Sequence, residues 1–256
     1  MVIVNDVFDN LRELAPTELQ LSYDNSGFLI GHADAKLSRV ILSLDVTDEV
    51  IDEAIETGSE LIVSHHPVIW DAMKSVTDGD IGAKKLLRLI ENRIAVISMH
   101  TNLDIAPGGV NDVLLSLFEA ENEGFFEEDK CGRRGRLSKP VTMQEFLPYC
   151  KDRLCSSGLR YYDAGRPVEH IAVLGGSGGE NIRDAFIAGC DTYISSDFKY
   201  HELLLARELG INIVDGDHFC TEAPVMHMLA ERLSEAFPGV VFTVSKRHSQ
   251  TAAFYV

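Results

Sequence analysis

The chain has 256 residues with a formal net charge of −17, and 45% of its residues are hydrophobic. This composition is typical of a globular protein with one large or two small domains, and the acidic charge argues against nucleic acid or anionic membranes as partners. No apolar stretch reaches the about 20 residues of a membrane span, and the acidic N-terminus does not look like a signal peptide.

The five cysteines are odd in number and form no Cys-x-x-Cys pair. Such cysteines are typical of unlinked thiols in a reducing compartment, rather than of a disulfide framework or a cysteine-based zinc site. We therefore expect a cytoplasmic protein.

The first half of the chain alternates between helical and strand patterns. Apolar residues recur at helical spacing over residues 2–14, and a turn-rich stretch at 23–27 precedes a short apolar run at 28–30. Such alternation is typical of right-handed crossovers and a mostly parallel sheet. The pattern predicts strands at 39–45, 61–64 and 94–99, a helix from Thr47 to Gly58, and further helices at 83–91 and 111–120.

The second half repeats this order of elements without repeating the sequence. Residues 121–140 contain a run of acids, then arginines, with glycines between them, and we interpret them as an exposed connection and a candidate domain boundary. Helices are predicted at 143–154, 181–189 and 200–209 and from Thr221 or Glu222 through Leu233, and strands at 171–174, 192–195, 211–214 and 240–244.

Three of the predicted strands run into histidines. Because the carboxyl ends of parallel strands lie at one edge of a sheet, side chains that follow them can converge. Pro67 ends the first of these strands, so the two histidines before it can leave the alternation of a regular strand. The groups are His65 and His66 after 61–64, His100 with Asp104 after 94–99, and His218 with Glu222 after 211–214.

Four imidazoles and two carboxylates suit zinc, iron or manganese. Six such groups are too many ligands for one tetrahedral site with an open position. They fit two ions that share a carboxylate and lie roughly 3.5–4 Å from each other. The spacing of His218 and Glu222 predicts one face of a helix start, whereas Asp104 is expected to reach back from a loop. Four other histidines do not follow the end of a predicted strand, and they are interpreted as structural or surface residues. These are His32, His170, His227 and His248.

Two further stretches keep alternative interpretations. The glycine run 175–179 follows a strand but matches no nucleotide-binding motif, so it is either a tight strand-to-helix turn or a lining of the substrate cleft. His201, at the start of a predicted helix, is either a surface residue or an acid/base group beside the site.

The motifs together resemble the dinuclear metal-binding family of GTP cyclohydrolase I type two homologues, also called Nif-three-like proteins. The resemblance extends over most of the chain, and its most specific parts are Ser-His-His-Pro and His-Thr-Asn-x-Asp. The matching stretches are residues 23–31, 43–47, 64–67, 100–104, 175–179, 195–201 and 216–218 with Glu222.

The resemblance implies two interlinked α/β domains with mostly parallel central sheets. We expect residues 1–125, joined by 225–256, to form the first domain and residues 126–224 to form the second. The resemblance also implies two metal ions per subunit, with Glu222 as the bridging ligand and His100 as a ligand or a neighbour of the site. It further implies a ring-shaped homohexamer. The implied metal ligands are His65, His66, Asp104, His218 and Glu222.

Two functions remain open, besides a ring-shaped scaffold for protein partners that the family analogy alone implies. The first is a metal-dependent hydrolase, similar to a GTP cyclohydrolase, that acts on a nucleotide or a phosphorylated small molecule, with water activated by the ions and with protons moved by His100 or His201. The second is a metal-handling, metal-insertion or regulatory binding protein without turnover. The ligand set is consistent with both.

Overall fold

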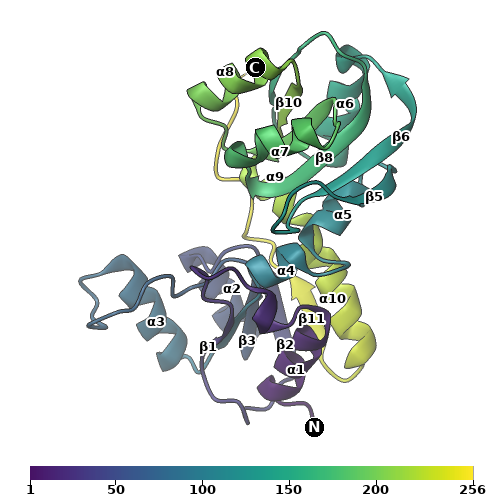
Figure 1. Ribbon diagram of the computed structural model, residues 1–256. Coiled ribbons are helices and arrows are strands. Elements are labelled where there is room, and N and C mark those ends of the chain that lie inside the picture. Colours follow the sequence, from purple (N-terminus) through teal and green to yellow (C-terminus); the bar gives the residue numbers. More distant parts are fainter. Residues whose placement is uncertain (256) are drawn as a thin grey trace. The chain divides into compact units, whose positions relative to one another are not determined.

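The computed structural model describes residues 1–255, which form two α/β units. One unit comprises Met1–Pro107 and Met226–Ser249, and the other comprises Gly108–Val225 with the chain from Gln250 onward. The chain therefore leaves the first unit and re-enters it later, so the units are interlinked along the sequence. In Figure 1 this return is visible as the yellow strand β11, which lies beside the purple-blue strand β2.

The first unit contains a five-stranded sheet in the order β1-β4-β3-β2-β11. Only β1 runs antiparallel to its neighbour; the other pairs are parallel. Ser43, Ser64 and Ser98 are paired in register, so β2, β3 and β4 end level with one another. The strands are β1 Gly27–Ile30, β2 Arg39–Ser43, β3 Leu61–Ser64, β4 Ala95–Ser98 and β11 Val241–Val244.

Helix α2 of the first unit begins and ends where the sequence supplies caps. The Thr47 hydroxyl accepts a hydrogen bond from the Val50 amide at the start of α2, and Gly58 adopts the left-handed conformation at its end. The helical segments are α1 Val4–Leu14, η1 Thr17–Leu19, α2 Asp48–Thr57, α3 Ile81–Glu91, α4 Thr101–Ile105 and α10 Pro224–Ala236.

The second unit contains a six-stranded sheet in the order β5-β6-β8-β9-β10-β7. The three adjacent strands β8, β9 and β10 are parallel, and antiparallel strands flank them on both sides. The two-unit α/β architecture is confirmed, with a parallel centre in each sheet. The strands are β5 Glu121–Phe125, β6 Arg133–Val141, β7 Arg160–Tyr162, β8 Val168–Ser177, β9 Thr192–Ser196 and β10 Asn212–Asp215.

Residues 121–140 are mostly exposed, as their composition indicated, but they contain two paired strands and are not an irregular connection. They form the antiparallel pair β5–β6, in which Glu121 lies opposite Arg136 and the two side chains are 3.2 Å apart. The acids and arginines therefore face one another across two strands. Arg133 is buried, and its Nε donates to Asp112 at 2.8 Å.

The helices of the second unit pack on the parallel strands around a core that includes Phe118, Phe146 and Ile194. None of the helices within residues 1–255 is long and apolar enough to cross a membrane. The helical segments are α5 Val110–Ser116, α6 Met143–Arg153, η2 Gly179–Asn181, α7 Ile182–Ile187, α8 Tyr200–Leu209 and α9 His218–Glu222.

The cysteines are expected to react with alkylating reagents at very different rates. Cys150, Cys190 and Cys220 are buried, and burial raises the pKa of each thiol to about 12. Few of these thiols are thiolates at pH 8, whereas Cys155 is exposed. Iodoacetamide labelling followed by peptide mass spectrometry should modify Cys155 in the native protein and the three buried cysteines only after unfolding. Equal labelling of Cys150 and Cys155 in the native protein would contradict this packing.

Candidate metal centre

His65 and His66 follow β3 at the level edge of the first sheet. The His65 and His66 amides donate to the carbonyls of Ser43 and Leu44, but the regular strand ends at Ser64 and both histidines lie in a bend. In a regular strand the two rings would point to opposite faces. Their centroids lie only 5.0 Å apart, however, so the rings do share one side just before Pro67.

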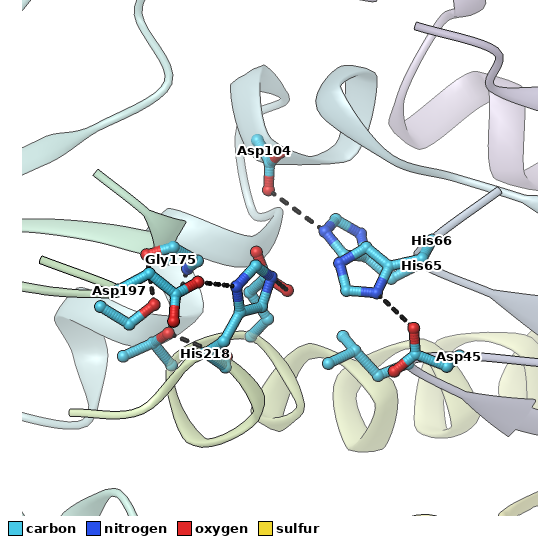
Figure 2. Close-up of polar contacts among 12 residues, drawn as sticks. Asp45, His65, His66, Asp104, Gly175, Asp197 and His218 are labelled. Carbon is cyan, nitrogen blue, oxygen red and sulfur yellow. Dashed lines mark hydrogen bonds and ion pairs between the residues drawn. The ribbon is translucent and has the colours of Figure 1, made fainter. Parts of the chain in front are cut away.

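His65 is buried, and one of its ring nitrogens is fixed by the backbone. Its Nδ1 lies 2.8 Å from the Met99 carbonyl oxygen. Because a carbonyl only accepts hydrogen bonds, Nδ1 carries the proton and Nε2 carries the lone pair. Nε2 lies 3.7 Å from Oδ1 of Asp104, as the dashed line in Figure 2 shows.

His66 is oriented in the same way, but by a carboxylate. Its Nδ1 donates to Asp45 Oδ1 at 2.7 Å, and Asp45 follows the neighbouring strand β2 (Figure 2). Burial alone would raise the pKa of Asp45, but hydrogen bonds from His248 and His66 outweigh burial and hold this pKa well below its usual range. His248, interpreted from the sequence as structural or surface, therefore contacts the carboxylate behind His66.

His100 completes a group of three histidines in the first unit. Its Nδ1 donates to Asp24 Oδ1 at 2.8 Å, and the ligand atoms of His65, His66 and His100 lie within 4.8 Å of one another. Burial tends to raise the pKa of Asp24, but hydrogen bonds from His100, Thr101 and Ser26 lower it well below its usual range. Asp24 is therefore an anion that holds the His100 ring. These three histidines can bind a metal ion.

Asp104 lies on a short helix, not on the loop that we expected. The helix α4 begins at Thr101, whose amide donates to Asp24 Oδ2 at 3.0 Å. The Asp24 carboxylate therefore accepts a hydrogen bond from the first turn of α4, whose N-cap residue provides no side-chain cap. A cap supplied from 77 positions away in the chain is invisible to local sequence patterns.

The second unit holds His218 and Glu222 on α9. Their i, i+4 spacing brings Nε2 of His218 to 3.1 Å from Oε2 of Glu222, as predicted for one face of a helix start. Nδ1 of His218 donates to Asp197 Oδ2 at 2.7 Å (Figure 2). Asp197 and Asp217 both have left-handed backbone conformations, with φ of 56° and 74°. Strain of this kind at non-glycine residues gathers at functional sites.

The glycine run 175–179 is part of this second ligand set. Strand β8 continues through Gly175 and Gly176 to Ser177, so no strand-to-helix phosphate loop forms there. Gly176 has φ of +70°, and a Cβ on it would lie 2.1 Å from Glu222 Oε1 and 3.2 Å from His218 Nε2. The hydroxyls of Ser195 and Ser196 donate to the Gly176 carbonyl. The glycine is thus required for close approach of the backbone to the two ligands.

His201 lies near the start of α8, and its side chain is 75% exposed. Across residues 1–255 its recorded polar contact is with Glu202, at 3.9 Å between Nε2 and Oε1. The acid/base role of His201 stays a prediction.

The donor atoms of each unit fit a divalent metal ion. Two atoms that bind one ion at about 2.0–2.2 Å can be at most about 4.4 Å apart. The distances of 3.7 Å between His65 Nε2 and Asp104 Oδ1, and of 3.1 Å between His218 Nε2 and Glu222 Oε2, meet this limit. In addition, the Nδ1 atoms of four histidines contact an oxygen acceptor, which is how metal-binding histidines are usually held. These are His65, His66, His100 and His218.

Comparison with known proteins identifies the family. A sequence model of the Duf34/NIF3 family (NGG1p interacting factor 3) matches residues 2–251. This chain belongs to the Duf34/NIF3 family. A GTP cyclohydrolase 1 type 2 homolog of Clostridium perfringens is 34% identical over 252 residues, which cover 95% of this chain and 96% of the relative.

Solved structures show the same NIF3 fold. A hypothetical protein of Staphylococcus aureus is 25% identical with a TM-score of 0.89, and the match covers 99% of both chains. Reduced HcgD from Methanocaldococcus jannaschii is 27% identical with a TM-score of 0.85, covering 96% of this chain and 98% of HcgD.

The three carboxylates behind the histidines were not predicted from the sequence as members of the site. Asp24, Asp45 and Asp197 each bind Nδ1 of one histidine. A usable signal was present for two of them, because Asp45 and Asp197 follow strands that neighbour the histidine-bearing strands. Asp24 lies in a turn before β1, and only the fold brings it to His100.

Trp70 is expected to report metal binding by its fluorescence. It is the single tryptophan of the chain, and its ring centroid lies 5.2 Å from that of His100. A Co²⁺ ion bound by the histidines would lie close enough to the indole to quench its emission. Titration with Co²⁺ should lower the emission, and a chelator should restore it. Unchanged emission in protein shown to hold Co²⁺ would contradict the position of Trp70.

Proposed function

We propose that this NIF3-family chain binds two divalent metal ions and is a metal-dependent hydrolase. The observation that carries the proposal is the fixed Nδ1 of three proposed ligands, His65, His66 and His218, since it presets each Nε2 as a ligand before any ion binds.

The metal ligands that the family resemblance implies belong to both units. One imidazole and one carboxylate, from His218 and Glu222, are fewer than the three protein ligands of a typical catalytic zinc site. His65, His66 and Asp104 form a larger set in the first unit. We propose that the two sets together bind both ions, with Glu222 as the bridging ligand. The argument rests on the number and type of donors in each unit.

A divalent ion in such a centre supplies a water with lowered pKa and polarises the bond to be cleaved. The chain's own residues hold the donors in place: Met99, Asp45 and Asp197 fix the rings of His65, His66 and His218. We propose that His100 moves a proton at Nε2, because Asp24 keeps its Nδ1 protonated and its ring in place.

The relatives' name, GTP cyclohydrolase 1 type 2 homolog, supports a nucleotide or phosphorylated small molecule as substrate. Trp70 adds support, because its side chain is half exposed beside His100 and can stack on a planar ring. We further propose, from the family resemblance, that the chain forms a homohexamer; light scattering on the purified protein tests this assembly.

A substrate screen tests the hydrolase. Protein loaded with Zn²⁺, Mn²⁺ or Fe²⁺ is incubated with nucleoside triphosphates and phosphate monoesters and diesters, and products are separated by chromatography. The proposal predicts metal-dependent turnover that the His65→Asn protein lacks and the His32→Asn protein keeps, since His32 is exposed. Metal binding without turnover on any class would contradict the hydrolase and favour metal handling, which exchange with an apo acceptor protein would then test.

A further inference from the structure

We propose that His248 is a positioning residue that acts on His66 through Asp45. The inference rests on the proposed function, in which His66 binds metal. It concerns the chain's own hydrogen bonds, all of them within the first unit. His248 comes from the C-terminal part of that unit, 203 positions from Asp45 in the chain.

Both nitrogens of His248 have assigned partners, and these define its protonation. The Leu44 amide donates to Nδ1 at 3.0 Å, so Nδ1 carries the lone pair. Nε2 therefore carries the proton, and it donates to Asp45 Oδ2 at 3.0 Å. His248 is thus held as a neutral donor that points at the carboxylate.

Asp45 links the two histidines. Its Oδ2 accepts from His248 and its Oδ1 accepts from His66, so each carboxylate oxygen binds one imidazole. The orientation of the carboxylate follows from the first contact, and the direction of the His66 Nε2 lone pair follows from the second. The Nδ1 of His65, in contrast, faces the neutral Met99 carbonyl. The two adjacent ligands are therefore supported differently.

The segment that carries His248 is anchored to the fold. After β11, the Ser245 amide donates to the Leu42 carbonyl, and the Ser245 hydroxyl donates to Glu53 of α2. The amides of Lys246 and Arg247 also donate to Glu53. These bonds place His248 against Asp45 from a fixed backbone. The position of His248 is therefore a property of the folded first unit.

Two substitutions separate the two contacts of His248. In His248→Asn the shorter amide reaches only the position of Nδ1, where its oxygen can accept from the Leu44 amide while the donor to Asp45 is lost. In His248→Gln the longer amide reaches the position of Nε2, where its nitrogen can donate to Asp45. His227→Asn is the matched control, because His227 is an exposed histidine of the same unit.

The experiment measures three quantities for each variant of the full chain: Zn²⁺ affinity in competition with a chromophoric chelator, the visible absorption spectrum with Co²⁺, and the unfolding midpoint of the apo protein. Loss of a direct hydrogen-bond partner of a metal-binding histidine weakens metal binding roughly 10–100-fold. Because His248 contacts Asp45 and not His66 itself, we expect His248→Asn to weaken metal binding less, by about 3–10-fold. The Co²⁺ spectrum of His248→Asn should also shift. His248→Gln should restore much of the wild-type Zn²⁺ affinity and Co²⁺ spectrum. His227→Asn should leave the affinity and the spectrum unchanged.

Three outcomes would overturn the inference. The first is wild-type Zn²⁺ affinity and Co²⁺ spectrum in His248→Asn. The second is equal loss in His248→Asn and His248→Gln, since a donor to Asp45 would then be irrelevant. The third is a loss matched by an equal fall in apo stability, which indicates packing alone. A wild-type protein that binds neither ion would instead refute the proposed function, and with it the role of His66.

Discussion

The His65→Asn protein is expected to lose tight metal binding and keep its fold. The asparagine amide nitrogen can replace Nδ1 and donate to the Met99 carbonyl, which His65 contacts at 2.8 Å. It has no group at the position of Nε2, 3.7 Å from Asp104. Loss of the group that hydrogen-bonds a metal-binding histidine weakens metal affinity roughly 10–100-fold, and removal of the ligand itself should weaken it further. Competition titration with Zn²⁺ measures the change.

The stability of the same variant is the internal control. One hydrogen bond is kept and a small apolar volume is lost, so the apo protein should unfold within about 1–2 kcal/mol of the wild type. His32→Asn, an exposed change in the same unit, should leave both quantities unchanged. If His65→Asn bound Zn²⁺ as tightly as the wild type, His65 would not be a ligand.

The second large effect is expected for Gly176→Ala. A Cβ at this position would lie 2.1 Å from Glu222 Oε1, which is the far end of a flexible side chain. Glu222 can therefore move aside and the strand can persist, but the carboxylate leaves its place 3.1 Å from His218 Nε2. We expect metal affinity to fall by about 10–100-fold or more, as for other losses of site geometry, measured by the same competition titration.

Gly189→Ala separates this effect from backbone strain. Gly189 also lies in the left-handed region, with φ of +84°, but nothing lies within 4 Å of a Cβ built on it. Both alanines should cost about 1–2 kcal/mol of unfolding free energy for the left-handed conformation. Only Gly176→Ala should weaken metal binding. Equal metal affinities in the two variants would show that Gly176 serves the backbone turn and not the ligands.

Local patterns were sufficient to predict the parallel centre of each sheet. Largely apolar runs of four to seven residues, separated by helical patterns, predicted β2, β3, β4, β9 and β10, because a buried parallel strand is apolar on both faces. The hairpin β5–β6 was missed because its charged residues are paired across strands, so its composition is that of an exposed loop.

The candidate ligands were predictable, but the groups that hold them were only partly so. His65, His100 and His218 follow strands, and strand order alone brings such residues to a sheet edge. Asp24 and His248 reach the site through contacts 76 and 203 positions away in the chain. Separations of this size have no local signature, because only the fold determines which distant segments meet.

The central claim, that ligands of both units bind two ions together, is tested most directly by metal stoichiometry. Protein loaded with Zn²⁺ and freed of excess metal is analysed for zinc per chain, as wild type and as His218→Asn, which keeps a donor to Asp197 in place of Nδ1. We predict two zinc ions per wild-type chain and fewer than two for the variant. Two ions retained by His218→Asn, or none bound by the wild type, would contradict the claim.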